Sequence, residues 1–256
     1  MTSAHPHGSE LHPATHGFER AADAYERGRP DYPAEAVGFL VERLGLRPGR
    51  VVLDLAAGTG KLTRLLVPSG AEVIAVEPIA EMREKIHEAR ALEGTAEAIP
   101  LADASVDAVT VAQAFHWFRP EEALREIHRV LRPGGGLALV WNVRDESNPL
   151  QAGATEIIRP LEEDVPRRHK RDWRAVLDES SDLFTSAELV TFDHEQLVDE
   201  DAFVERFTSV SFVAAAPPDQ RADVESQLRA LARAAGTPIR LPYMTELYLA
   251  TRANDR

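Results

Sequence analysis

Hydrophobic residues follow two different spacings over residues 34–142. Short apolar runs of strand length occupy residues 51–55, 72–76, 106–112 and 136–142. Apolar residues between these runs recur at helical spacing, which predicts helices over 34–46, 60–67, 79–90 and 120–131, and a short extended piece is expected over 92–96. Strands that are separated by helix-length connections predict a parallel sheet with helices on both faces.

The pattern changes in the second half of the chain. Residues 149–186 are polar with helical spacing, and helices are also expected over 199–208 and 219–235. Residues 190–198 and 243–251 alternate like strands, and we expect the last of these runs to return to the sheet.

Residues 1–17 differ in composition from the rest of the chain. Four of the nine histidines (His5, His7, His12 and His16) stand there among Pro, Gly, Ser and Thr. Because these residues have no apolar partners that would order them, we expect a disordered, solvated tail rather than a metal site. No flexible linker follows, so residues 18–256 are predicted to form a single domain.

The run from Val51 to Gly60, VVLDLAAGTG, ends a predicted buried strand in small residues and leads into a helix. Small residues let the backbone approach a ligand closely. The next apolar run ends in Glu77, and an acid at the tip of that strand can accept hydrogen bonds from the two hydroxyls of a ribose. The two runs together predict a cofactor that contains a nucleoside.

A turn of this kind serves both nicotinamide dinucleotides and S-adenosylmethionine. The dinucleotide-binding motif has a third glycine at the position where this chain has Thr63. Asp54, just before the turn, would repel a pyrophosphate, but it can order the turn and face a cationic methionine portion. Residues 94–101, GTAEAIPL, place a short turn where an adenine ring would lie. These details favour S-adenosylmethionine, with an NAD(P)-dependent oxidoreductase as the alternative.

At these residues the chain resembles the class I S-adenosylmethionine-dependent methyltransferases. Residues 51–60 are similar to the family's first motif, Glu77 to its ribose acid and 94–101 to its adenine-side loop. Residues 103–109 and 130–135 are similar to the stretches that lead into its fourth and fifth strands. The resemblance implies a doubly wound α/β fold of Rossmann-like type. Its sheet would be mostly parallel and seven-stranded, with an antiparallel C-terminal strand and a helical substrate cover.

The resemblance also implies S-adenosyl-L-methionine as cofactor and S-adenosyl-L-homocysteine as product. The residues it assigns to cofactor binding are Tyr25, Arg29, Asp54, Ala56, Gly58, Thr59, Gly60, Glu77, Pro78, Met82, Thr95, Ala96, Glu97, Gln113 and Ala114. Two positions depart from the family pattern. Ala56 stands where the family has its first glycine. Thr95 stands where an acid beside the adenine amino group is common, which leaves that contact to a backbone group or to Glu97.

Residues 25–33, YERGRPDYP, and 113–118, QAFHWF, look like the trans-aconitate-methyltransferase-like branch, which acts on small molecules. By this resemblance Tyr25 and Arg29 cover the cofactor as part of a lid over residues 18–45. The alternative is that the two prolines of this segment only shape a loop.

Ligands of such folds lie outside the carboxyl ends of the parallel strands. His116 and Trp117 follow the fourth predicted strand, and Trp141, Asn142 and Arg144 end the fifth, so we expect these five residues at the substrate. His116 is the candidate catalytic residue, because an imidazole can deprotonate a hydroxyl or hydrogen-bond a carboxylate. A role in positioning its loop is the alternative.

Residues 145–185 lie in the variable region that forms the substrate cover in this fold. A basic cluster stands within them, composed of Arg167, Arg168, Lys170, Arg171 and Arg174. The cluster could attract an anionic substrate, although a solvated charged helix is the simpler interpretation.

The net charge and the composition limit the classes of partner that the protein can have. The net charge of −13 disfavours nucleic acid, whose binding requires cations on the protein. The absence of cysteine excludes disulfides and thiolate metal sites and suits a reducing compartment. No apolar run reaches the roughly 20 residues that a membrane span needs. We therefore expect a cytoplasmic protein with no membrane or nucleic-acid partner and no metal.

The reaction that these features predict is direct in-line transfer of a methyl group to an oxygen of a small molecule. The branch resemblance favours a carboxylate, which is already ionised at neutral pH and needs no base. A non-catalytic S-adenosylmethionine-binding regulatory protein is a second alternative.

Overall fold

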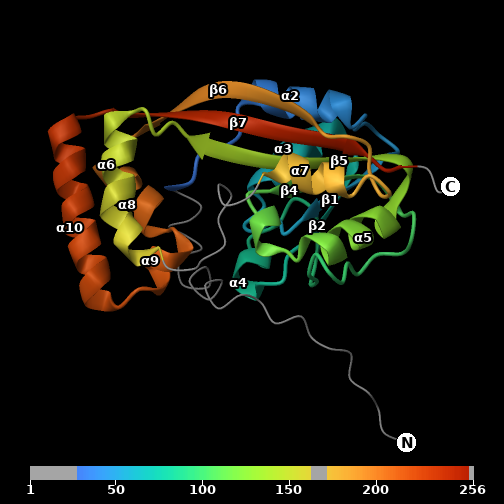
Figure 1. The fold of residues 1–256 in the computed structure, drawn as a ribbon, viewed down its shortest axis with the longest axis horizontal. Coiled ribbons are helices and arrows are strands. Elements are labelled where there is room, and N and C mark those ends of the chain that lie inside the picture. The colour runs from blue at the N-terminus through green and yellow to red at the C-terminus, as the bar shows by residue number, and fades with distance from the viewer. Residues whose placement is uncertain (1–27, 163–171, 254–256) are drawn as a thin grey trace, which may run out of the picture.

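A seven-stranded sheet organises the part of the chain that the computed structural model describes, residues 28–162 and 172–253. Its strands are β1 (Val51–Leu55), β2 (Glu72–Val76), β3 (Arg90–Leu92), β4 (Val106–Ala112), β5 (Leu131–Arg144), β6 (Glu188–Val198) and β7 (Ile239–Thr251). They lie in the order β3-β2-β1-β4-β5-β7-β6. The first five are parallel, and β7 runs antiparallel to both β5 and β6 (Figure 1). The predicted fold class is confirmed.

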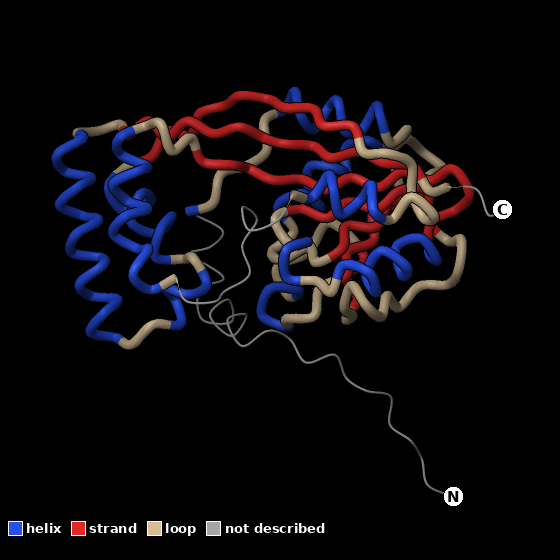
Figure 2. Tube along the Cα trace, in the orientation of Figure 1, coloured by secondary structure: helices blue, strands red, loops and turns tan. Residues whose placement is uncertain are grey.

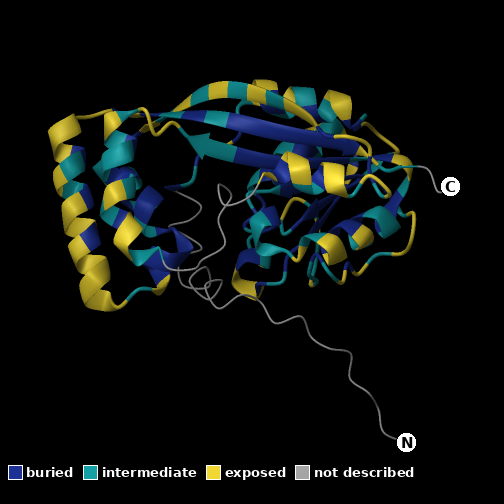
Figure 3. Ribbon diagram, viewed as in Figure 1, coloured by how far each residue is buried: buried dark blue, intermediate teal, exposed yellow. Residues whose placement is uncertain are grey.

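The two faces of the sheet are covered by different helices (Figures 1 and 2). The helices near the sheet are α2 (Ala34–Arg43), α3 (Lys61–Leu66), α4 (Ala80–Arg83), α5 (Pro120–Val130) and α7 (Trp173–Glu179). Short 3-10 turns are η2 (Val67–Ser69), η3 (Phe115–Trp117) and η4 (Arg159–Leu161). Successive strand residues face opposite sides. Leu53 thus packs with α5 and α7, and Val52 packs with α2 and α3. Because both faces are covered, the central parallel strands β1 and β4 are buried along most of their length and are mainly apolar (Figure 3).

Four further helices gather at one end of the sheet: α6 (Pro149–Ile158), α8 (Glu200–Thr208), α9 (Ser211–Ala215) and α10 (Pro218–Ala235) (Figure 1). We call them the helical region. Phe203, Phe207 and Leu228 are fully buried in its own apolar core. Val198 of β6 and Tyr243 of β7 belong to the same core, so the two long antiparallel strands join the helical region to the sheet. Among the described residues no helix is long and apolar enough to cross a membrane.

The helix expected over 79–90 is wrong beyond its first turn, since α4 spans only Ala80–Arg83. The chain turns there because Arg90 must already pair with Ile74 of β2, which also places the third strand at Arg90–Leu92 instead of 92–96. Ile86 is buried in this turn and lies against Gly60. Tertiary contacts therefore override the helical spacing of this segment.

Residues 145–185, which the sequence predicts as a substrate cover, contribute to two different cores. Ala154 and Ile158 belong to the core of the helical region. Trp173 and Leu177 pack instead on the sheet, where Trp173 stacks on Trp141 with ring centroids 5.6 Å apart. The helical region also includes residues 200–235. Four members of the basic cluster, Arg167, Arg168, Lys170 and Arg171, lie outside the described residues, as do residues 1–17 and Tyr25.

Candidate cofactor and acceptor site

The turn that follows β1 has an unusual backbone. Ala56, Gly58 and Gly60 all have a positive φ, of 55°, 59° and 80° respectively. The left-handed conformation costs a residue with a Cβ about 1–2 kcal/mol, so Ala56 occupies a position that favours glycine. Gln113, directly after β4, is also left-handed with φ of 59°. Ala56 and Gln113 line the same pocket, and such strain is typical of functional sites.

Asp54 is fully buried at the end of β1 and orders this turn from below. Its carboxylate accepts hydrogen bonds from Thr63 Oγ1 at 2.6 Å and from Thr110 Oγ1 at 2.9 Å. Burial raises the pKa of Asp54 to about 6, although the hydrogen bonds from the two hydroxyls lower that pKa in part. Both side chains that hydrogen-bond to Asp54 belong to the protein itself. One of them is Thr63, which stands where the dinucleotide pattern has its third glycine.

Glu77 closes the other side of the turn from the tip of β2. It is 4% exposed, and its carboxylate accepts hydrogen bonds from the backbone N–H of Gly58 at 2.8 Å and of Ile79 at 2.9 Å. Burial raises the pKa of Glu77 to about 7, and the two amides oppose that rise. Each carboxylate oxygen keeps a second lone pair with which it can accept from a ribose hydroxyl.

Of the predicted adenine-side residues, Thr95 and Ala96 belong to a tight turn, whereas Glu97 bonds to the start of the next helix. Thr95 and Ala98 form a tight antiparallel bridge, and Ala96 is buried between them in sequence. Glu97 accepts a hydrogen bond from the backbone N–H of Arg119 at 2.9 Å, just before α5 begins. Glu97 thus anchors the start of that helix in this structure. Of the remaining predicted cofactor residues, Met82 and Ala114 are buried and Pro78 is half-buried.

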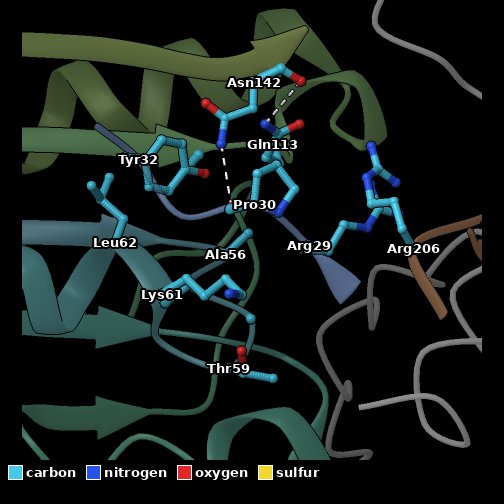
Figure 4. Close-up of a pocket in the computed structure, with 13 residues that line it drawn as sticks. Arg29, Pro30, Tyr32, Ala56, Thr59, Lys61, Leu62, Gln113, Asn142 and Arg206 are labelled. Atoms are coloured by element: carbon cyan, nitrogen blue, oxygen red, sulfur yellow. Dashed lines mark hydrogen bonds between the residues drawn. The ribbon is translucent and has the colours of Figure 1, made fainter. Parts of the chain in front are cut away.

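A pocket opens directly at the turn (Figure 4). Small residues of the turn form one side of it: Ala56, Ala57, Gly58 and Thr59. Arg29, Gln113, Asn142 and Arg206 line it from other elements, and Figure 4 shows Arg29 and Arg206 on the side away from Leu62. The pocket therefore joins the first strand's turn to the N-terminal segment, to the strand ends β4 and β5, and to α8.

A second cavity of about 500 Å³ lies beside this pocket. All five predicted substrate residues line it: His116, Trp117, Trp141, Asn142 and Arg144. The structure brings them together because the carboxyl ends of β4 and β5 are neighbours. Trp141 is only 1% exposed and packs mainly in the core, whereas Trp117 packs against the helical region. His116 sits in the turn η3, with its ring 5.1 Å from that of Trp117.

Asn142 holds the N-terminal segment in place. Its Nδ2 donates to the carbonyls of Pro30 at 3.3 Å and Asp31 at 3.2 Å, and its Oδ1 accepts from Thr245 Oγ1 at 2.6 Å. The Lys61 ammonium lies 2.8 Å from the Asp31 carboxylate and adds a second anchor. The amide of Asn142 is therefore engaged with the segment that carries Arg29.

Arg206 is the main site residue that the sequence did not suggest. It comes from α8, is 4% exposed and donates from Nε to the Tyr243 hydroxyl at 2.8 Å. A usable signal existed, because Arg206 falls three residues after Phe203 and next to Phe207, on the apolar side of a predicted helix. A charged residue at such a position is rarely buried without a reason.

The strand order, the left-handed turn after β1 and the buried acid after β2 are those of a class I S-adenosylmethionine-dependent methyltransferase, and the chain belongs to this family. A family profile described as methyltransferase domain matches residues 53–139. The methyl donor is S-adenosyl-L-methionine, and the protein is an enzyme of this class.

Relatives support the assignment over nearly the whole chain. The protein is 42% identical over 247 residues to an uncharacterized methyltransferase of Mycobacterium tuberculosis, Rv3342, with 92% of this chain and 96% of the relative covered. It is 33% identical to an uncharacterized methyltransferase-like protein of Schizosaccharomyces pombe, with 84% and 86% covered. A putative type II methyltransferase structure from Anaeromyxobacter dehalogenans aligns with a TM-score of 0.61 at 27% identity, covering 88% of this chain and 96% of that one.

The residues around the turn fit this cofactor. The backbone of Gly58 is held beside the Glu77 carboxylate, and the nearest atom to a Cβ built on Gly58 would be Met82 Sδ at 3.9 Å. Glu77 can take the ribose hydroxyls, and the small residues 56–60 can take the methionine portion at close range. When bound, the cofactor supplies an electrophilic methyl group on a sulfonium.

Proposed function

We propose that this methyltransferase acts on a small molecule and transfers the methyl group to an oxygen, with a carboxylate as the acceptor. One observation carries the proposal. The residues common to the cofactor pocket and the 500 Å³ cavity are Arg29, Gln113, Asn142 and Arg206. Among the described residues, this junction presents guanidinium and amide groups and no carboxylate.

A cationic junction favours an anionic nucleophile. An amine acceptor arrives protonated and would need a base and a negative partner, whereas a carboxylate is ionised at neutral pH and is attracted by guanidinium groups. In the reaction an oxygen lone pair of the acceptor forms the new C–O bond while the C–S bond breaks, which leaves neutral S-adenosylhomocysteine and a methyl ester. Proton transfer is not required, so His116 acts as a hydrogen-bonding wall residue and not as a base.

The size of the cavity supports a small acceptor. A volume of about 500 Å³ lies within the roughly 300–1,000 Å³ of typical small-molecule sites. Residues 28–33 form a wall of the cofactor pocket and are anchored by Asn142 and Lys61. We include in the proposal that this segment belongs to a lid over residues 18–45 that excludes water and aligns the acceptor with the methyl group.

An acceptor screen tests the proposal. Carboxylic acids, phenols, amines and thiols of matched size are incubated with the enzyme and S-adenosylmethionine. Mass spectrometry in acid-quenched samples follows S-adenosylhomocysteine and the methylated product. We expect methyl esters from carboxylic acids, in amounts that fall strongly with Glu77→Ala. Methylated phenols, amines or thiols in the absence of any ester would contradict the proposal.

A further inference from the structure

Arg206 is a buried cation whose hydrogen-bonding capacity is only partly used. Its Nε donates to Tyr243, and its guanidinium carbon lies 5.7 Å from the ring centroids of both Phe207 and Tyr243. Its Nη1 is buried and has no hydrogen-bond partner among residues 28–162 and 172–253. No ion pair of Arg206 is found within the described part of the chain. Burying a guanidinium nitrogen without a hydrogen-bond partner is costly, so the fold retains an unfavourable feature at this position.

A purely structural role does not account for this arrangement. The bond to Tyr243 uses Nε, and the two rings lie 5.7 Å from the guanidinium carbon. These contacts leave Nη1, which belongs to the terminal part of the side chain that binds anions. The hydrogen bond from Nε to Tyr243 restrains the guanidinium, and Arg206 lines the cavity.

A second guanidinium meets the same ring. Arg144, at the end of β5, has its guanidinium carbon 5.3 Å from the Phe207 centroid, and its side chain is 11% exposed. Its Nη2 lies 3.9 Å from the carboxylate of Glu146, a side chain that is 60% exposed. Arg144 and Arg206 therefore both lie close to the Phe207 ring, and both line the 500 Å³ cavity.

We propose that Arg206, together with Arg144, forms a subsite for an anionic group of the acceptor that is not itself methylated. This inference rests on the proposed function for the identity of the cavity as the acceptor site. The group is a carboxylate or a phosphate, since both match the guanidinium fork. The preferred acceptors are thus small molecules that carry a second anionic group in addition to the carboxylate that receives the methyl.

Calorimetry in the presence of S-adenosylhomocysteine tests the subsite without turnover. The probes are linear dicarboxylates with two to six carbons, their half-amides of equal length and one charge fewer, and ω-phosphonocarboxylates. We expect at least one dianion to bind at least tenfold more tightly than its half-amide. The phosphonates distinguish a carboxylate subsite from a phosphate subsite.

Two substitutions then locate the preference. Arg206→Met should abolish the preference for the dianion, and Arg206→Lys should keep part of it, because lysine retains the charge and loses the fork. Arg233→Met is the matched control: it removes one cation from the helical region at a side chain that is 68% exposed and paired with Glu200. We expect it to leave the preference unchanged. If Arg206→Met does not fold, as judged by circular dichroism, Arg144→Met and Arg206→Lys provide the same test.

Two outcomes would overturn the subsite: equal binding of every dianion and its half-amide, or a preference that survives in Arg206→Met and Arg144→Met. Other results would contradict the proposed function and leave the subsite intact, or the reverse. If dianions bind through Arg206 but no methyl ester forms, the subsite stands and the acceptor oxygen is wrong. If monocarboxylates are esterified as well as dicarboxylates and Arg206→Lys leaves KM unchanged, the reaction stands and the subsite is wrong.

Discussion

Gly28 lies directly against the backbone of Arg206. A Cβ built on Gly28 would fall 2.6 Å from the Arg206 nitrogen and 2.8 Å from its Cα, closer than real Cβ atoms approach. This contact places the N-terminal segment on α8, while Asn142 and Lys61 hold the same segment on the sheet. The segment therefore spans from the sheet to the helical region and carries Arg29 to the junction of the two cavities.

Gly28→Ala should displace this segment. Accommodating the added methyl against backbone costs roughly 1–3 kcal/mol, either in stability or in the docking of the segment. We expect weaker binding of S-adenosylhomocysteine by calorimetry. Gly38→Ala is the control, because a Cβ there meets nothing within 4 Å and helix α2 gains up to about 1 kcal/mol. Equal affinity and stability in wild type and Gly28→Ala would show that the close contact does not hold the segment.

Cofactor affinity should depend on the protonation of Glu77. Its pKa is raised to about 7 in the free protein by burial, and ribose hydroxyls would donate to the ionised carboxylate. Binding therefore releases a proton at acidic pH, and affinity for S-adenosylhomocysteine should rise with pH up to about 7 and level off above it. Calorimetry in buffers of different ionisation enthalpy measures the proton release.

The Glu77→Ala variant serves as the reference for this titration. It should bind S-adenosylhomocysteine more weakly by roughly 1–3 kcal/mol and lose the pH dependence near neutrality. A variant that binds as well as the wild type would mean that the ribose lies elsewhere.

Thr63→Val should destabilise the protein through Asp54. The substitution removes a 2.6 Å hydrogen bond to a buried carboxylate, a loss of roughly 1–3 kcal/mol. The pKa of Asp54 is raised from 3.8 to about 6 in the folded state, so its contribution to stability falls as pH rises through that window. Because losing the hydroxyl raises this pKa further, urea denaturation should reveal a larger deficit at pH 8 than at pH 5. Thr63→Ser keeps the hydroxyl and should stay near wild type, and equal losses in both variants would rule out the bond as the cause.

His116→Gln should keep most of the activity on a carboxylate acceptor. Glutamine retains hydrogen bonding but cannot take a proton near neutral pH, and the acceptor has no proton to lose. We expect kcat within about tenfold of wild type and an unchanged pH profile in steady-state assays. A base would be worth roughly 10²–10⁴ in rate, so a loss of that size would assign the proton transfer to His116.

The proposed cofactor half of the site could be predicted from the sequence because its residues lie close together along the chain. The run 51–60, Glu77 and the strand runs follow from short-range spacing, and the parallel order then brings their carboxyl ends together. The same reasoning placed His116 and Asn142 beside one cavity, since they follow adjacent strands. It failed at 79–90, where pairing with β2 and the burial of Ile86 end the helix early.

The part of the proposed acceptor half that surrounds Arg206 could not be predicted from the sequence, because tertiary packing assembles it. Arg206, Phe207 and Tyr243 meet across α8 and β7, and Gly28 reaches them from the opposite end of the chain. No short-range spacing links Gly28, Arg206 and Tyr243, because they are far apart in the sequence and meet only where α8 packs beside β7. Thr63 illustrates the difference: the sequence reveals that it replaces a glycine, and only the fold reveals that its hydroxyl holds Asp54.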